Sequence, residues 1–257
     1  MWYLIQSYIK FLKKSTNQHG VHSPFIFNLI TQCFYDKTKY EDYTILNSYR
    51  TKLYNNKETI SITDFGAGSR VFKSNQRVIS EIAKTAGIHP KRAQLLYRIT
   101  HYLKSKNNLE LGTSLGMATS ALSLGSKNGT TTTIEGCPKT AQVAQQHFLD
   151  FDLKNINLKV GPFETELDNI KNQTFDIIYI DGNHQKEATL DYFEKLQGSI
   201  HNDSLMIFDD IHWSESMTEA WESIKNHQSV TVTIDTFFWG FVFFRKEQEK
   251  EHFTIRV

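Results

Sequence analysis

The sequence predicts an α/β protein whose sheet is largely parallel and carries helices on both faces, preceded by a helical extension. From Asn108 onward, stretches typical of strands and of helices alternate, which is the pattern of strand–helix–strand units. The run Phe175–Asp181 is apolar at most positions, as expected of a strand buried on both faces. Near the end of the chain, Ser229–Ile234 and Gly240–Arg245 are strand-like runs with a short connection, which predicts an antiparallel hairpin.

Five strands, including the buried run just described, are expected in the alternating part of the chain, before the hairpin. They lie at Asn108–Leu111, Thr131–Ile134, Ile156–Val160, Phe175–Ile180 and Ser204–Phe208. Helices are expected at Ala118–Leu124, Lys139–Phe151, Ala188–Leu196 and Met217–Lys225. We divide the chain into a helical extension (residues 1–58), a connecting or lid segment (59–89) and a main domain (90–257).

The chain starts with an amphipathic helix. Its apolar side chains recur at helical spacing, and its lysines lie largely off that stripe. We expect the stripe to dock on the body of the protein, with binding to a membrane surface as the alternative. The stripe consists of Trp2, Ile5, Tyr8, Ile9 and Leu12.

The composition of the 257-residue chain is that of an ordinary folded protein, with 39% hydrophobic and 22% charged residues. Its longest strongly apolar run, Phe237–Phe244, is too short to span a bilayer, and residues 1–14 lack the order of a signal peptide. Cys33 and Cys137 form neither a metal-binding pattern nor a disulfide framework. A reduced, cytoplasmic setting is therefore expected, and secretion, membrane spanning and thiolate–zinc chemistry are disfavoured.

The charge is unevenly distributed along the chain. Residues 1–108 contain 17 Lys and Arg against 6 Asp and Glu, whereas residues 109–257 contain 12 against 22. A basic half of this kind is compatible with a nucleic-acid or anionic-lipid surface. Because the basic residues are spread thinly rather than clustered, we favour the alternative that the two halves pack on each other.

A glycine-rich turn follows the first strand of the alternation. Gly112 and Gly116 permit a tight turn and a close approach of a ligand to the backbone, and the next helix begins with free N–H groups. The following strand ends at Glu135, 23 positions after Gly112. Nucleoside-binding sheets place an acid that accepts from ribose hydroxyls at about this distance. Together the two features predict a nucleoside-bearing ligand at the carboxyl ends of these strands.

Carboxylates and histidines follow the fourth and fifth predicted strands. Asp181 follows the fourth strand, and Asp209 and Asp210 follow the fifth, so neighbouring strands would bring three carboxylates together. Such a cluster needs a cation, a shared proton or solvation, and oxygen ligands suit Mg²⁺ or another hard divalent cation. Helix capping and solvation are the alternative. His184 and His212 are candidate general bases because imidazole titrates near neutrality.

A second glycine turn, Asp64–Ser69, also resembles a nucleotide-binding turn. A basic, polar stretch follows it, however, rather than a strand that ends in an acid at the right distance. We interpret the segment as a loop that folds over the site and brings Arg70, Lys73 and Arg77 toward an anionic substrate. Disorder or simple packing is the alternative.

Taken together, the motifs LELGTSLG, TTTIEG, FDIIYIDGNH and LMIFDDIHW and the closing hairpin resemble the class I S-adenosylmethionine-dependent methyltransferases, and within them the O-methyltransferase-like branch. The segments HGVHSPF and DDIHWS resemble bacterial members of this superfamily. The resemblance covers residues 90–245 and implies a Rossmann-like seven-stranded sheet in the order 3-2-1-4-5-7-6, with the last strand antiparallel. Residues 90–257 would then be the methyltransferase domain.

The resemblance also implies roles for individual residues. The glycine turn would surround the methionine part of S-adenosylmethionine, Glu135 would hold its ribose hydroxyls, and residues 161–164 would lie near its adenine. The residues expected around the cofactor are Gln94, Glu110, Gly112, Thr113, Gly116, Glu135, Gly161, Phe163 and Asp181. Metal-dependent relatives carry an Asp-Asn pair after the fifth strand. Here the pair is Asp209-Asp210, so the set of candidate metal ligands, Asp181, Asp209 and Asp210, departs from that pattern.

We therefore expect the protein to catalyse O-methylation of a small-molecule acceptor, with Asp181, His184 and His212 as the catalytic groups. A nucleic-acid methyltransferase that uses the basic half is an alternative, disfavoured because no Asn/Asp-Pro-Pro-aromatic motif follows the fourth strand. A non-catalytic interaction module is another. An NAD-dependent oxidoreductase is disfavoured because its Gly-x-Gly-x-x-Gly fingerprint is missing from the turn. The identity of the acceptor, the need for a metal and the formation of a homodimer are left open.

Overall fold

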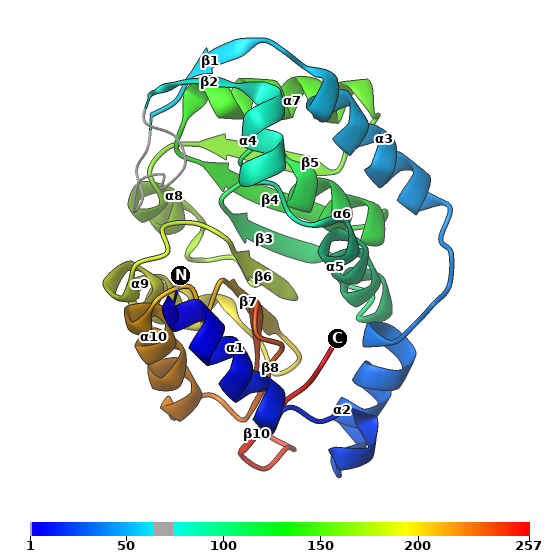
Figure 1. Cartoon of the computed structure of the whole chain (residues 1–257), viewed down its shortest axis with the longest axis vertical. Helices are drawn as coiled ribbons and strands as arrows, with labels where there is room; N and C mark the ends of the chain where they lie inside the picture. The colour runs from blue at the N-terminus through cyan, green and yellow to red at the C-terminus, as the bar shows by residue number, and fades with distance from the viewer. Residues whose placement is uncertain (1, 64–73) are drawn as a thin grey trace. The chain divides into compact units, whose positions relative to one another are not determined.

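The computed structural model describes residues 2–63 and 74–257 (Figure 1). The chain divides into two units. We call residues 1–35 and 170–257 the terminal unit, and residues 36–169 the central unit. The glycine turn Asp64–Ser69, with Arg70 and Lys73, lies outside the described residues. Its interpretation as a loop over the site therefore stays a prediction, as does the division of the chain at residues 58 and 89.

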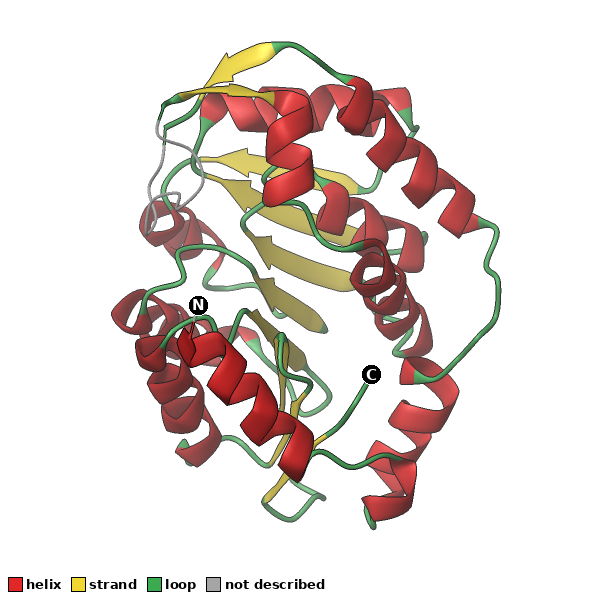
Figure 2. Ribbon diagram, viewed as in Figure 1, coloured by secondary structure: helices red, strands yellow, loops and turns green. Residues whose placement is uncertain are grey.

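The central unit is built on three parallel strands, and β4 pairs with both β3 and β5. Residues 131–133 of β4 are buried threonines, whose β-branched side chains favour an extended backbone. A helix follows each strand, as the alternation predicted (Figure 2). The elements are α3 (Asp42–Asn55), β1 (Thr59–Ser61), β2 (Gln76–Val78), α4 (Ile79–Thr85), α5 (Pro90–Tyr102), β3 (Asn107–Leu111), α6 (Met117–Gly125), β4 (Thr130–Glu135), α7 (Pro138–Asp150), β5 (Ile156–Val160) and α8 (Phe163–Ile170).

The terminal unit contains five strands in the order β10-β8-β9-β7-β6. β6 and β7 are parallel, whereas β9 is antiparallel to β7 and β8. Every residue of β6, β7 and β9 is buried, as expected of strands covered on both faces. The elements are α1 (Trp2–Lys14), η1 (Gln18–Gly20), α2 (Pro24–Leu29), η2 (Ile30–Phe34), β6 (Ile177–Ile180), α9 (Lys186–Lys195), η3 (Leu196–Ser199), β7 (Leu205–Asp209), α10 (Glu215–Asn226), β8 (Val232–Asp235), β9 (Trp239–Phe243) and β10 (Glu251–Thr254).

Local sequence signals explain where several helices begin. Pro90 opens α5 and Pro138 opens α7, at a position where the missing N–H group would have no partner within the helix. Ser23 precedes α2, and its hydroxyl accepts from the Ile26 N–H. Ser214 caps α10 in the same way, by accepting from the Met217 N–H at 3.2 Å.

The predicted fold class is confirmed. The seven predicted strands are β3 to β9, and they follow the expected order 3-2-1 in the central unit and 4-5-7-6 in the terminal unit. The last of them, β9, is antiparallel as expected. The expected strand number was one too low, because β10 adds an eighth strand beside β8. Only Phe253 of its four residues is buried, so β10 lacks the apolar pattern of the other strands.

Helix α1 docks on the body of the protein through only a small part of the expected stripe. Phe11 is the buried residue of this helix among its described positions, whereas Trp2, Ile5, Ile9 and Leu12 are exposed. Tyr8 of the expected stripe does dock, because its ring centroid lies 4.8 Å from that of Phe237. The expectation was wrong for the other four stripe residues, which are exposed. Across the described residues, every helix is too short or too polar to cross a membrane.

Candidate functional site

The glycine turn after β3 lies against the end of β4. Gly112 and Gly116 have φ angles of 102° and 77°, in the left-handed region that favours glycine. The N–H groups of Gly112 and Thr113 both donate to the carbonyl of Ile134, at 3.0 and 3.2 Å. Ser114, between the two glycines, also has a positive φ, 47°. Three positive φ angles and these two hydrogen bonds fold the turn beside the carboxyl end of β4.

Glu135 adjoins this turn, as the parallel register requires. Leu111 of β3 pairs with Ile134 of β4, so the next residues, Gly112 and Glu135, are adjacent. The Glu135 carboxylate accepts from the N–H of Ser114 at 2.8 Å through Oε2 and from the N–H of Cys137 at 2.8 Å through Oε1. The structure thus brings together the two features that predicted a ligand site.

Glu110 is a fully buried carboxyl group just before the turn. Its Oε2 accepts from the hydroxyls of Thr119 and Thr133, the latter at 2.6 Å, whereas its Oε1 has no hydrogen-bond partner among the described residues. Burial raises the pKa of Glu110 to about 8, with a smaller contribution from the charge of Glu135, against the lowering effect of the two threonine hydroxyls. Because an unpaired buried oxygen is costly, this atom is suited to accept from a cationic or hydrogen-donating group of a ligand.

The back of the glycine turn is packed against two helices. A side chain at Gly116 would come within 2.4 Å of the Phe148 ring and 2.5 Å of the Tyr49 hydroxyl. Tyr49 also donates to the carbonyl of Leu115 at 2.9 Å. Gly116 is therefore needed for packing as well as for its φ angle. Tyr49 supports the turn from α3, and no local pattern in the sequence indicates this role.

The remaining residues expected near the cofactor are also in the central unit. Gln94 is half-buried on α5. Gly161 follows β5, and its N–H donates to the carbonyl of Glu135 at 3.0 Å, which joins it to the end of β4. Phe163 is half-buried at the start of α8. Their roles in holding a cofactor stay predictions.

The terminal unit brings Asp181 and Asp209 together. Ile180 of β6 pairs with Phe208 of β7, so the carboxylates follow on neighbouring parallel strands. The Tyr179 hydroxyl lies 3.1 Å from Asp181 Oδ2 and 3.3 Å from Asp209 Oδ2. Burial raises the pKa of Asp181 well above its ordinary value, and the negative charges of Asp209 and Asp210 raise it further.

The same residues do not form a metal centre in this structure. Within residues 2–63 and 74–257, no group of three or more His, Cys, Asp or Glu side chains is arranged to hold a metal ion. Asp210 has a φ of 52°, and its N–H donates to Asp209 Oδ1 at 2.9 Å. The divalent cation at Asp181, Asp209 and Asp210 therefore stays a prediction.

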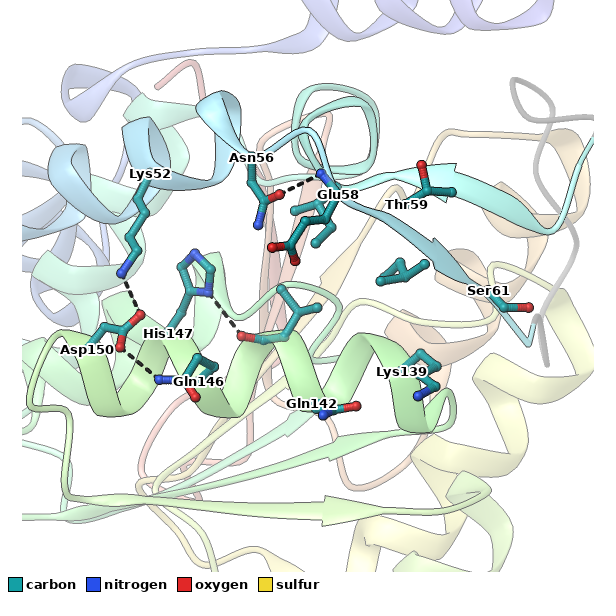
Figure 3. Close-up of a pocket in the computed structure, with 13 residues that line it drawn as sticks. Lys52, Asn56, Glu58, Thr59, Ser61, Lys139, Gln142, Gln146, His147 and Asp150 are labelled. Atoms are coloured by element: carbon teal, nitrogen blue, oxygen red, sulfur yellow. Dashed lines mark hydrogen bonds and ion pairs between the residues drawn. The ribbon is translucent and has the colours of Figure 1, made fainter.

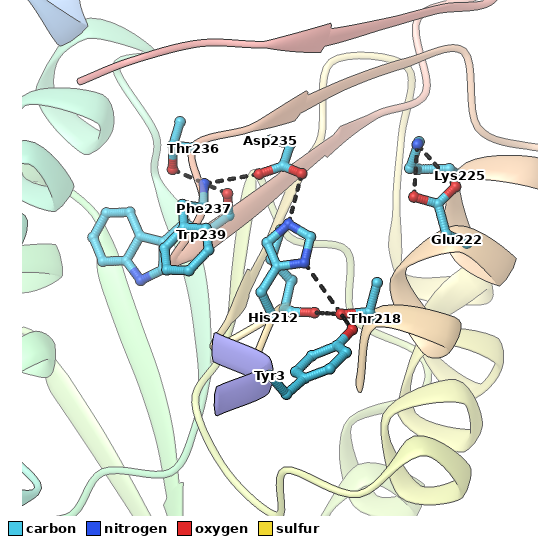
Figure 4. A network of polar contacts seen from close by, with 10 residues as sticks. Tyr3, His212, Thr218, Glu222, Lys225, Asp235, Thr236, Phe237 and Trp239 are labelled. Carbon is cyan, nitrogen blue, oxygen red and sulfur yellow. Dashed lines mark hydrogen bonds and ion pairs between the residues drawn. The ribbon is translucent and has the colours of Figure 1, made fainter. Parts of the chain in front are cut away.

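The two candidate bases have different surroundings. His184 is half-buried, and its Nε2 lies 3.7 Å from Asp181 Oδ1. His212 has both ring nitrogens in short contacts, Nε2 with Asp235 Oδ2 at 2.8 Å and Nδ1 with Thr218 Oγ1 at 3.1 Å (Figure 4). This network fixes the orientation of the His212 ring. The sequence did not indicate Asp235 as its partner, because Asp235 lies 23 residues later, at the end of β8.

A groove of about 480 Å³ runs along α7 in the central unit, where it is also lined by residues of α3 and β1 (Figure 3). Its lining includes His147, which is 4% exposed. His147 Nδ1 is 3.0 Å from the carbonyl of Val143, and Nε2 is buried with no partner among the described residues. Burial lowers the pKa of His147, which favours the neutral ring. Glu110, Gly112 and Glu135 are not among the residues that line this groove.

Comparison with known proteins identifies similarity at two levels. A family model described as a methyltransferase domain matches residues 109–211, which include the glycine turn, Glu135 and both aspartates of the terminal unit. No curated protein sequence matches the chain.

Solved structures with similar folds extend over more of the chain. An O-methyltransferase from Bacillus cereus in complex with SAH is 22% identical, with a TM-score of 0.54, over 62% of this chain and 83% of that one. An SAH-bound methyltransferase from Podospora anserina is 13% identical, with a TM-score of 0.64, over 88% and 97%. An O-methyltransferase from Streptomyces achromogenes involved in tomaymycin synthesis, in complex with SAM, is 14% identical, with a TM-score of 0.55, over 62% and 82%. At these identities the similarity establishes the fold.

Proposed function

We propose that this chain is a class I, S-adenosylmethionine-dependent methyltransferase that methylates a hydroxyl group of a small molecule; the methyltransferase-domain match over residues 109–211 supports this proposal. The observation that carries the proposal is the pair of acidic residues at the glycine turn. Glu110 precedes the turn with one buried oxygen that has no partner among the described residues, and Glu135 ends the adjacent strand. Two acceptor groups beside a turn with positive φ angles are suited to a ligand that has both an ammonium group and sugar hydroxyls.

The residues present fit this cofactor. Glu110 Oε1 would accept from its ammonium group, and Glu135 would accept from the ribose hydroxyls. Gln94, Gly161 and Phe163 are proposed to lie along its nucleoside. When bound, S-adenosylmethionine supplies a methyl group that is electrophilic because it is attached to a sulfonium. The chain then has to bind and orient the two reactants and remove the acceptor proton.

We assign the removal of the acceptor proton to His184, with Asp181 beside it. His184 Nε2 is 3.7 Å from Asp181 Oδ1, so an acidic side chain lies next to the ring that takes up the proton. The proposal gives His212 a positioning role beside these groups, because Asp235 and Thr218 occupy its two ring nitrogens. We derive no step through a metal ion. The divalent cation, the acceptor site at Asp209 and Asp210, and the contribution of Asp181 to cofactor binding stay predictions.

Transfer of a labelled methyl group tests the proposal. The purified protein is incubated with methyl-labelled S-adenosylmethionine and a panel of phenolic and aliphatic hydroxyl compounds, with RNA and DNA included as rival acceptors. We expect label in a small hydroxyl compound, and loss of this activity in Glu135→Gln but not in Glu81→Gln, an exposed glutamate on α4. Label in nucleic acid would support the alternative that the basic half of the chain is its platform.

The variant His184→Gln tests whether His184 acts in proton removal rather than in cofactor binding. It should lower kcat at least about tenfold while the KM for S-adenosylmethionine stays within about twofold, because general-base catalysis contributes mainly to the chemical step. His19→Gln, at an exposed position of the terminal unit, is the matched control. Equal kcat values for the wild-type protein and His184→Gln would remove His184 from the mechanism.

A further inference from the structure

Helix α1 is held on the terminal unit by one of its faces. Phe11 is 7% exposed, and its ring centroid is 5.6 Å from that of Phe237. The Tyr3 hydroxyl donates to Thr218 Oγ1 at 2.8 Å (Figure 4). These contacts come from different turns of α1, so they fix which face of the helix points away from the unit.

The outward face of α1 carries an apolar stripe. Trp2, Ile5, Ile9 and Leu12 are spaced three or four residues apart, which aligns them on one side of a helix. Ile9 is two residues from Phe11, and so lies more than half a turn around the helix from it. The stripe residues are 71%, 47%, 48% and 40% exposed, in chain order.

This exposure is concentrated on α1 rather than scattered over the protein. Together with Tyr8, which is 44% exposed, α1 has five of the eleven large hydrophobic side chains that are exposed in the described part of the chain. Single exposed apolar residues are normal on protein surfaces, whereas a contiguous set indicates an interaction site. The stripe therefore indicates that α1 binds a partner that has an apolar surface or layer.

The charge of α1 indicates the kind of partner that binds the stripe. The helix contains three lysines and no acidic residue. Lys10 and Lys14 line a hollow together with the docked Phe11, whereas Lys13 does not. Lys13 follows Ile9 by four positions and so adjoins the stripe. A second copy of α1 would bring further lysines and no carboxylate to the contact, which disfavours a pairing of two such helices. An anionic surface with an apolar layer beneath it complements both features.

We propose that α1 is a membrane-surface helix that inserts Trp2, Ile5, Ile9 and Leu12 into the interfacial layer of an anionic lipid bilayer. The helix lies in the plane of the surface, and Lys13, which adjoins the stripe, contacts the lipid headgroups. The 13-residue helix is too short to span the bilayer, so the association is peripheral and reversible. This inference is independent of the methyl-transfer reaction, since it concerns a different surface and needs no cofactor.

Vesicle co-sedimentation of the full-length protein tests the proposal. The vesicles consist of phosphatidylcholine alone or of phosphatidylcholine mixed with phosphatidylglycerol. We expect binding to the mixed vesicles that weakens as salt is added, and much weaker binding to the neutral ones. The double variant Ile5→Gln/Ile9→Gln should lower the partition coefficient at least about tenfold, because two apolar side chains leave the bilayer. Leu149→Gln, which changes a 65% exposed residue on α7, should leave it unchanged.

Two further measurements keep the result interpretable. The double variant should melt at the same temperature as the wild-type protein, because both substituted positions are exposed. Light scattering on a sizing column should give the same mass for both proteins. Absence of binding by the wild-type protein to either vesicle would overturn the proposal. A wild-type dimer that dissociates in the double variant, without vesicle binding, would overturn it in favour of an interface between copies.

Discussion

Replacing Glu110 with glutamine should change how the folding stability of this protein depends on pH. Glu110 is fully buried, and its pKa is raised to about 8 from an ordinary value of 4.5. In the unfolded chain the carboxyl group is ionised above its ordinary pKa, whereas in the folded protein it keeps its proton until the pH approaches the raised value. The unfolded state therefore binds fewer protons in this window, and the wild-type protein loses stability as the pH rises through it.

The magnitude follows from the pKa difference. Each pH unit in the window lowers the free energy of unfolding by about 1.4 kcal/mol for one proton. Between about pH 5.5 and about pH 7.5, Glu110 thus costs the wild-type protein about 3 kcal/mol. Glutamine has no such titration and keeps an oxygen that accepts from Thr119 and Thr133. The stability of Glu110→Gln relative to wild type should therefore increase by about 3 kcal/mol over these two pH units.

Urea unfolding at several pH values, without cofactor, is the assay. Asp181, whose pKa is also raised, is present in both proteins, so its contribution cancels in the difference. Glu81→Gln is the control, because Glu81 is exposed on α4 and its removal should leave the pH dependence in place. Parallel loss of stability by the wild-type protein and Glu110→Gln across the window would refute the reasoning.

Three further predictions concern residues that hold the fold together. Gly116→Ala should destabilise the protein by about 2 kcal/mol or more in urea unfolding, since the new methyl group clashes at a positive φ, whereas Gly198→Ala, with nothing within 4 Å, should have little effect. Gly240→Ala, whose methyl group would meet the buried Trp221 ring at 2.6 Å, should lower Tm by several degrees, about 2–4 °C per kcal/mol. Asn155→Ala should cost about 2–4 kcal/mol, because the Asn155 side chain donates to three backbone carbonyls, whereas Asn172→Ala at an exposed position should not.

The fold could be predicted from local patterns because strands and helices alternate regularly. The same regularity located the acidic residues at strand ends, since parallel strands place their carboxyl ends at one edge. In a parallel pair the residues that follow two paired residues are themselves neighbours. This register explains why Glu135 lies beside Gly112 and why Asp181 lies beside Asp209. β10 was not predicted, because an edge strand with one buried residue has little apolar pattern in its sequence.

The finer geometry of the site depends on contacts between distant parts of the chain. Tyr49 supports Leu115 across 66 positions, and Asp235 orients His212 across 23. Neither pair has a spacing that a helix or strand period would reveal. The exposure of most of the α1 stripe was not predicted for a related reason. Helical periodicity locates an apolar stripe in the sequence, but it does not show whether the rest of the protein packs on that stripe. His147 in the α7 groove likewise has no sequence signal, because its burial is a tertiary property.

Calorimetric titration of the protein with S-adenosylmethionine tests the central claim most directly. The wild-type protein should bind one equivalent per chain. Glu135→Gln should bind at least about tenfold more weakly, because charged hydrogen bonds to the ribose hydroxyls are weakened, and Glu81→Gln should bind like the wild type. Equal affinity of Glu135→Gln and the wild-type protein, or no binding by the wild-type protein, would contradict the placement of the cofactor at the glycine turn.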